Sequence, residues 1–295
     1  MPFAPRPHTE LVYVRDLPAE PVTLPGADRP ARLITLSRSP LNGAISAVVI
    51  LPPGWRRTAG SNPLTFSEFF LLSGDLQLGD HLLQPWHYLR LAKGANPGAW
   101  QTTHGARLLW FTNDDPLAWE LSEPGEQGVL HVNTNVLEWT LPFVPGSNVA
   151  RTGARLLIKL LYRDPDEGGY TRLVRQLPGW EEPRLEHHLC TEEAYGLVGV
   201  STYNFGVAPA DSYFWRPPRI QHGNFRAGES GKIGLTRTDG PLENLYSTLE
   251  GDPLNWEPGS GRDPIPVEEV CPIRSPSAGP LPPQPHARAQ LREQR

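Results

Sequence analysis

The chain repeats itself at an offset of about 125 residues. Trp55 and Trp180 end the segments LPPGW and LPGW, and Gly74 corresponds to Gly199 at the same offset. Further matching pairs are Glu68 and Glu193, Leu72 and Leu197, Tyr88 and Tyr213, and Gly98 and Gly223. Matching turn residues at matching places are typical of a duplicated structural unit. The sequence therefore predicts two similar units joined in one chain of 295 residues.

Short apolar runs separated by turn residues fill both units. The runs LVYVRDL, ARLITLS and AISAVVIL are rich in β-branched residues, and 34 Pro and 28 Gly punctuate the chain. Runs of this length between Gly- and Pro-containing turns are typical of β-strands. We therefore expect an all-β protein.

Composition excludes several classes of partner. A net charge of −5 leaves no strongly basic face, so we expect no nucleic-acid partner. No segment approaches the roughly 20 apolar residues of a membrane helix, and the N-terminus lacks the apolar stretch of a signal peptide. Only 2 Cys are present, which excludes a disulfide framework and fits a reducing compartment. We expect a cytoplasmic protein with no membrane partner.

Potential metal ligands concentrate between residues 185 and 222. Glu186, His187, His188 and Glu192 lie close together in LEHHLCTEEAYGLVG, and His222 follows after YFWRPPRIQ. Imidazole nitrogens and carboxylate oxygens that converge on one point are the ligands of divalent transition metals. Because alternate residues of a strand share a face, Glu186 and His188 are expected to point together and His187 away from them.

The spacing of these residues resembles the two motifs of the cupin superfamily. His188, Glu192 and Gly199 fit its first motif, and the segment from Pro217 to His222 fits its second. In the second motif Arg219 stands where the family usually has Gly. The resemblance implies a duplicated cupin, with two β-barrel or jelly-roll units in one chain.

One departure from the first motif leaves the ligand set open. The place of the family's first His falls on Glu186. Either Glu186 binds the metal, or a local bulge turns His187 inward, which we favour because His is the commoner ligand in the family. The expected ligands are therefore His187, His188, Glu192 and His222, with Glu186 as the alternative to His187. Such a set suits one divalent metal ion, for which we favour Fe, with Mn, Zn or Ni as alternatives.

The repeat supplies an internal comparison for this site. At the offset of 125 residues, the first unit carries other residues at the ligand positions, namely Ser61, Asn62, Pro63, Ser67 and Pro97. All the ligand candidates are replaced together, while the turn residues remain. We therefore expect a metal only in the second unit.

The motifs and turn signals divide the chain into five parts. These are an N-terminal arm (1–10), a first cupin unit without metal ligands (11–120), a connector (121–149), a metal-binding cupin unit (150–255) and a tail (256–295). The tail is rich in Pro, Arg and Gln and poor in large apolar residues, so we expect its last part to be disordered.

The opening of the second unit, ARLLIKLLYRDPDEGGYTRLVRQLPGW, resembles a subset of cupins. This subset contains the metal-binding domains of bacterial zinc anti-sigma factors and small dioxygenases acting on hydroxyacetophenones. The resemblance implies a metal-dependent enzyme with a small-molecule substrate, favouring a non-haem Fe(II) dioxygenase that cleaves a C–C bond. Alternatives are a metal- or ligand-sensing binding protein, a metal-dependent isomerase or hydrolase, and a scaffold stabilised by its metal. Homo-oligomers are compatible with each of these functions.

Trp215 is a candidate for the substrate pocket because it precedes His222 on the same strand-and-turn segment. We favour a place in the barrel core or between the units, since a large aromatic side chain is usually buried in packing.

Overall fold

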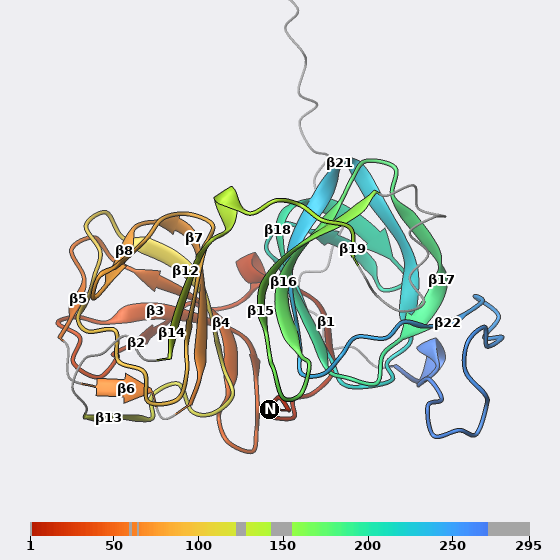
Figure 1. Ribbon diagram of the computed structural model, residues 1–295, viewed down its shortest axis with the longest axis horizontal. Coiled ribbons are helices and arrows are strands. Elements are labelled where there is room, and N and C mark those ends of the chain that lie inside the picture. The colour runs from red at the N-terminus through yellow and green to blue at the C-terminus, as the bar shows by residue number, and fades with distance from the viewer. Residues whose placement is uncertain (1, 59–60, 64, 122–127, 143–154, 271–295) are drawn as a thin grey trace, which may run out of the picture.

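The computed structural model describes residues 2–58, 61–63, 65–121, 128–142 and 155–270. Within these residues it contains strands and three short 3-10 helices, and no α-helix. Two β-barrel-like bodies lie side by side (Figure 1). None of the described segments forms a helix long and apolar enough to cross a membrane. The expected all-β fold with two units in one chain is confirmed.

The first body contains a seven-stranded sheet in the order β14-β10-β7-β12-β4-β3-β2, a four-stranded sheet β5-β11-β8-β9 and the pair β13-β6. Its strands are β2 (Glu20–Val22), β3 (Ala31–Arg38), β4 (Ile45–Leu51), β5 (Arg56–Arg57), β6 (Ser61–Pro63), β7 (Ser67–Gly74), β8 (Leu76–Leu78), β9 (His81–Leu83), β10 (His87–Leu91), β11 (Trp100–Gln101), β12 (Ala106–Thr112), β13 (Trp119–Leu121) and β14 (Val129–Asn133). The 3-10 helices are η1 (Val14–Asp16), η2 (Thr134–Val136) and η3 (Val267–Glu269).

The second body is a strongly bent sheet with the path β1-β20-β18-β21-β16-β15, to which β17, β19 and β22 add. Its strands are β1 (Thr9–Tyr13), β15 (Leu156–Arg163), β16 (Tyr170–Gln176), β17 (Glu181–His187), β18 (Glu192–Tyr203), β19 (Gly206–Pro209), β20 (Ser212–Arg216), β21 (His222–Thr238) and β22 (Leu245–Ser247). The long strand β21 pairs with β17 near its start and with β16 and β18 near its end, so it closes the barrel.

The repeat is present in three dimensions. Gly74 and Gly199 both have positive φ angles, 85° and 76°. A Cβ atom would lie 1.9 Å from the carbonyl oxygen of Gly105 at the first position and 2.1 Å from that of Gly231 at the second. Both glycines are therefore required by a left-handed backbone and a close approach. The two partner residues, Gly105 and Gly231, are 126 residues apart, one more than the offset of the repeat. The second unit therefore has one extra residue after Gly223, compared with the first unit after Gly98.

The N-terminal strand β1 precedes the first body in the chain but belongs to the sheet of the second body. β1 pairs with β20 of the second unit, with Thr9 opposite Trp215 and Tyr13 opposite Ser212. The sequence division placed residues from 11 onward in the first unit, whereas residues 9–13 form an edge strand of the second. Periodicity predicts a strand here but does not say which sheet edge it covers.

One buried apolar cluster contains residues of both bodies. Val48, Phe70 and Leu109 of the first unit are buried in the same cluster as Leu173 and Leu235 of the second. Burial of apolar surface of this kind is the main force that holds such an interface together. The two units therefore pack as one folded body rather than as independent domains.

The segments expected as connector and tail are partly ordered. β14, in the expected connector, pairs with β10 in the first unit's sheet. Residues 256–270, in the expected tail, pack against the second barrel, where Ile265 forms a β-bridge with Ile220. The remainder of the tail, 271–295, lies outside the described residues.

Candidate metal centre

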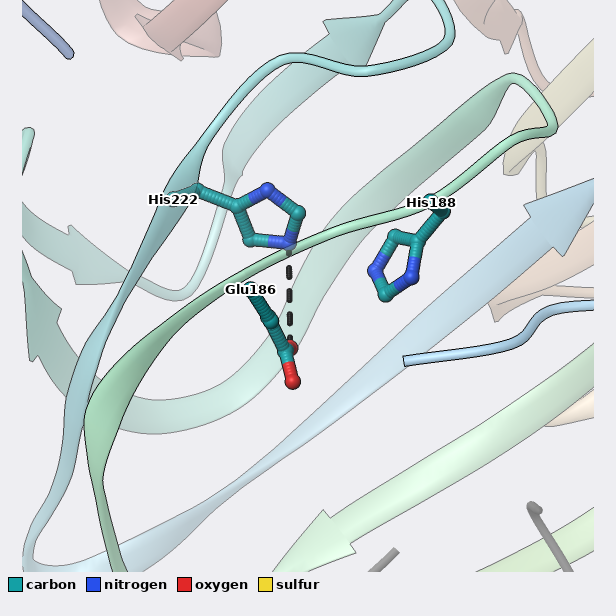
Figure 2. A group of neighbouring side chains, drawn as sticks. All are labelled: Glu186, His188 and His222. Atoms are coloured by element: carbon teal, nitrogen blue, oxygen red, sulfur yellow. Dashed lines mark ion pairs between the residues drawn. The ribbon is translucent and has the colours of Figure 1, made fainter. Parts of the chain in front are cut away.

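Three of the candidate ligands meet inside the second barrel. Glu186 on β17 lies directly opposite His222 on β21 in the strand register. His188 follows one residue after the end of β17, on the same face as Glu186. One ligand atom from each of the three residues lies within 4.8 Å of the others (Figure 2). In the described part of the chain, this is the sole group of three or more such residues close enough to hold a metal ion.

Both histidines present their Nε2 atoms to the centre. The Nδ1 atom of His222 is 2.8 Å from the carbonyl oxygen of Ile220, and that of His188 is 2.9 Å from the carbonyl oxygen of Glu243. A carbonyl accepts only, so each Nδ1 carries the proton and each Nε2 carries a free lone pair. The Nε2 of His222 is buried and has no hydrogen-bond partner. A buried polar atom without a partner is costly, which indicates a ligand at this position.

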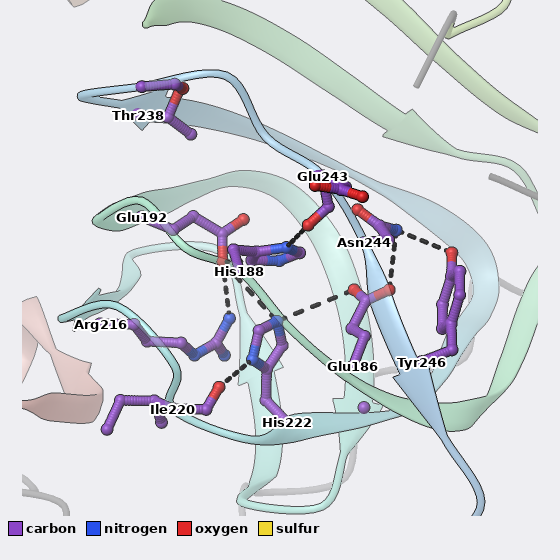
Figure 3. Close-up of polar contacts among 12 residues, drawn as sticks. Glu186, His188, Glu192, Arg216, Ile220, His222, Thr238, Glu243, Asn244 and Tyr246 are labelled. Carbon is purple, nitrogen blue, oxygen red and sulfur yellow. Dashed lines mark hydrogen bonds and ion pairs between the residues drawn. The ribbon is translucent and has the colours of Figure 1, made fainter. Parts of the chain in front are cut away.

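The carboxyl group of Glu186 completes the group. One of its oxygens lies 3.7 Å from the Nε2 of His222. The other accepts a hydrogen bond of 2.8 Å from the side-chain amide of Asn244, which also contacts the Tyr246 hydroxyl at 2.7 Å (Figure 3). Burial, followed by the neighbouring Glu192 carboxylate, raises the pKa of Glu186 to about 8. A carboxyl in this position therefore favours a bound cation in place of its proton.

Glu192 lies at the border of the centre. Its Oε2 is 4.0 Å from the Nε2 of His188 and 3.8 Å from that of His222. The same oxygen accepts a 2.9 Å hydrogen bond from Arg216 (Figure 3). The Arg216 guanidinium also binds Glu10 of β1. Arg216 thus holds the Glu192 carboxylate beside the three other groups and neutralises part of its charge.

His187 does not join this group, which corrects the expectation that a bulge turns it inward. Its Nε2 lies 2.7 Å from the carbonyl oxygen of Arg262, and its ring stacks edge-on against Trp256. The register shift in β17 occurs between Glu182 and Leu185, before the ligand segment, so strand alternation is intact from Leu185 onward. Glu186, the alternative, lies in the centre instead.

The unusual Arg in the second motif keeps the backbone that a Gly would adopt. Arg219 has a φ angle of 72°, in the left-handed region. Its amide donates to the carbonyl oxygen of His188 at 2.7 Å, and its own carbonyl accepts from Ile265. These two hydrogen bonds stabilise a conformation that costs a non-Gly residue about 1–2 kcal/mol. The turn that delivers His222 is preserved despite the substitution.

Trp215 lies away from the cavity, which corrects its candidacy for the substrate pocket. It is buried in the core shared by the two bodies, with the Arg6 guanidinium 4.2 Å from its ring centroid. Its neighbours on β20, Phe214 and Arg216, face the cavity. The favoured alternative, a place between the units, is what the structure shows.

A cavity of about 170 Å³ extends from the ligand group into the second barrel. Apolar side chains such as Leu156, Ile158 and Phe225 form much of its wall. Polar groups enter it from Arg172 and Lys232. A small, mostly apolar cavity with a few polar groups is typical of a site for a small molecule.

Several residues of the centre had no signal that singled them out in the sequence. Arg216 follows Trp215 on a strand, so the two side chains point to opposite faces of the sheet. The sequence does not indicate which of the two faces the cavity. Asn244 and Glu243 come from a segment outside both motifs. Their contacts depend on how β22 folds beside β17, which no local pattern predicts.

The donor set therefore fits a divalent transition metal. Two imidazoles with fixed tautomers and one carboxylate converge, and each is oriented by a hydrogen bond to a second group. Metal-binding histidines usually donate their other N–H to a carbonyl or carboxylate in this way.

Comparison with known proteins identifies a family. The model of the family described as a domain of unknown function, DUF4437, matches residues 10–245, and the chain belongs to this family. No curated protein matches the sequence.

Solved structures share the fold. A "putative dioxygenase" from Nostoc punctiforme is 20% identical with a TM-score of 0.72, over 83% of this chain and 88% of that one. A "putative glyoxylate induced protein" from Pseudomonas aeruginosa is 16% identical with a TM-score of 0.54, over 74% and 84%. Protein Ylba from E. coli is 15% identical with a TM-score of 0.53, over 77% and 89%. At these identities the likeness concerns the fold.

Proposed function

We propose that this DUF4437 protein is a metal-dependent enzyme of the non-haem Fe(II) dioxygenase type that acts on a small oxygenated substrate. Glu186, His188 and His222 are the ligands in this proposal. Two His and one carboxylate are the set found in Fe(II) oxygenases, with positions left open for oxygen and substrate. The observation that carries the proposal is the convergence of these three side chains in the wall of a mostly apolar cavity.

The chain's own residues prepare the site. The carbonyl oxygens of Ile220 and Glu243 fix the tautomers of the two histidines, so no proton has to leave Nε2 when a metal binds. Asn244 orients the Glu186 carboxylate. The apolar wall of the cavity excludes water from a bound substrate. Iron in such a set supplies the redox chemistry of oxygen-dependent enzymes.

The position of Glu192 separates this function from a second candidate. While Arg216 holds the Glu192 carboxylate, the centre has a single carboxylate ligand. One Glu192 oxygen lies 3.8 Å and 4.0 Å from the two Nε2 atoms, and if it bound the metal as well, two carboxylates would neutralise a divalent ion. That set favours Mn or Zn and a redox-neutral isomerase or hydrolase. The match to a "putative dioxygenase" favours the first function.

The test combines metal analysis with oxygen uptake. The protein is purified without chelators, its metals are measured per chain, and oxygen consumption is followed with β-diketones, hydroxyketones and catechols. We expect one iron per chain and uptake with at least one substrate class. Stoichiometric Zn or Mn without oxygen uptake would favour the isomerase or hydrolase, and a chain without bound metal would refute both functions.

A further inference from the structure

Three cations and three carboxyl groups line the cavity beside the candidate metal centre, and one of the carboxyl groups, Glu186, is a candidate metal ligand. Arg216 is matched by Glu10 and Glu192, and Glu182 is matched by Arg184. Among the described residues, no carboxylate pairs with either of the two other cations that line the cavity, Arg172 and Lys232. Buried charges are usually paired, so two unmatched cations beside a site for a divalent metal indicate an anionic ligand.

Arg172 is the closer of the two to the ligand group. On β16 it lies opposite Thr236 of β21, which in turn pairs with Ala194 of β18. Ala194 is the next inward position after Glu192, about 7 Å along the strand. The guanidinium lies over the Tyr170 ring, 4.5 Å from its centroid, and its Nε is buried without a hydrogen-bond acceptor. A carboxylate is the acceptor that matches a guanidinium best.

Lys232 adds positive potential to the same cavity. Its ammonium group donates to the hydroxyl of Ser201 at 3.1 Å, which is a neutral partner. Burial, with the charge of Arg216, lowers the pKa of Lys232 to about 8. The side chain is therefore a cation at neutral pH in a place that disfavours cations, and a bound anion would relieve this.

We propose that the substrate is a small carboxylate that carries a second oxygen function, a keto or hydroxyl group, and that Arg172 binds its carboxylate. The second oxygen then lies toward Glu186, His188 and His222. The cavity volume of about 170 Å³ limits such a ligand to a few carbon atoms beyond these groups. The orientation of the ligand, with its second oxygen toward the metal, rests on the proposed function. The negative charge of the ligand is inferred from Arg172 and Lys232 alone.

The test compares acetoacetate with acetylacetone, in which a neutral acetyl group replaces the carboxylate. Both are titrated calorimetrically into the wild type, Arg172→Met, Arg172→Lys and Arg175→Met, each in metal-free and Zn-loaded form. Arg175 lies on the same strand with its guanidinium toward Trp139 rather than in the cavity, so it is the matched control. Comparing each variant with the wild type cancels the affinity of either probe for zinc itself.

We expect Arg172→Met to weaken acetoacetate at least about tenfold, the effect of losing a charged hydrogen bond, and acetylacetone less than about twofold. Arg172→Lys should recover part of the loss, and Arg175→Met should change neither affinity. Equal weakening of both probes by Arg172→Met, no weakening, or no binding of acetoacetate to the wild type would overturn the proposal. Zinc content is measured on the same samples. Failure to bind zinc would refute the metal centre, while the metal-free titrations would still decide the anion site.

Discussion

At the residue scale, strand parity separates two adjacent residues of similar chemistry. Glu186 lies with His188 and His222, whereas His187 contacts Arg262 and Trp256. The two faces of β17 therefore serve different purposes. One face carries the candidate ligands, and the other anchors the segment after residue 255 to the barrel.

This separation gives a direct prediction for metal content. His222→Ala should lose most of the bound metal, because it removes one of three convergent ligands. Replacing even a residue that orients a ligand costs about 10–100-fold in affinity, and a ligand costs more. Metal per chain, measured by mass spectrometry, is the readout.

The control for this measurement is His187→Ala. It should retain the metal, because its imidazole lies outside the centre. A His187→Ala protein without metal, or a His222→Ala protein with full metal, would contradict the assignment of the ligands.

A second prediction at this scale concerns Lys232. Its pKa in the folded protein is about 8, below the ordinary value of 10.5. The unfolded chain therefore binds this proton more tightly, so the charge destabilises the fold at pH 7, and the cost disappears as pH rises from about 8 to 10.5. Lys232→Met should raise the free energy of unfolding of the metal-free protein by about 1–3 kcal/mol at pH 7.

The gain should shrink when denaturant unfolding is repeated at pH 10, and Lys93→Met, at an exposed position, should change little at either pH. An unchanged gain at both pH values would mean that packing, rather than charge, is responsible.

At the element scale, β1 connects the N-terminus to the candidate metal centre. Glu10 is fully buried on this strand and binds Arg216, which in turn holds Glu192. The strand thus closes the edge of the second barrel and supplies a charge that the barrel's own Arg requires. An exposed edge strand would otherwise be open to pairing with other chains.

Glu10→Ala should therefore destabilise the protein, because Arg216 is left buried with a single carboxylate. Breaking a buried ion pair costs about 3–5 kcal/mol, and we expect the lower part of this range because Glu192 remains. Equilibrium unfolding in denaturant measures the change. Glu20→Ala, at an exposed position on β2, is the control and should lie within about 0.5 kcal/mol of the wild type.

At the scale of the whole molecule, one arginine joins the two units. Arg237 of the second unit is buried between Glu68 and Glu193, which are equivalent positions of the repeat. Glu68 also accepts a hydrogen bond from Thr171, and Glu193 accepts one from Tyr213. A network with every member hydrogen-bonded is rigid, and removing its central charge leaves two buried carboxylates.

Arg237→Met should lower the free energy of unfolding by at least about 3–5 kcal/mol. Because the apolar core is also shared, both units should still unfold in one transition, and calorimetry can establish whether they do. Arg163→Met, at an exposed position, should leave the midpoint unchanged. Two separate transitions in the wild type would contradict the view that the units form one cooperative body.

The sequence by itself determined the features that depend on local pattern. Alternating apolar runs and turn glycines predict strands, because side-chain direction in a strand has a period of two. The offset of 125 residues predicts the duplication, and Gly74 and Gly199 confirm it with the same left-handed backbone. The motif spacing predicts that His188 and His222 approach each other, and in the structure both lie in one group with Glu186.

Only the tertiary structure decided the features that depend on distant segments. Whether Glu186 or His187 faces inward depends on the place of the bulge in β17, which is set by pairing with β21. The role of Arg216 depends on β1, more than 200 residues away in the chain. The local sequence does not distinguish the two faces of a strand or the two edges of a sheet. Pairing between distant strands decides which face is buried and which edge is covered, because it determines where each buried charge finds its partner.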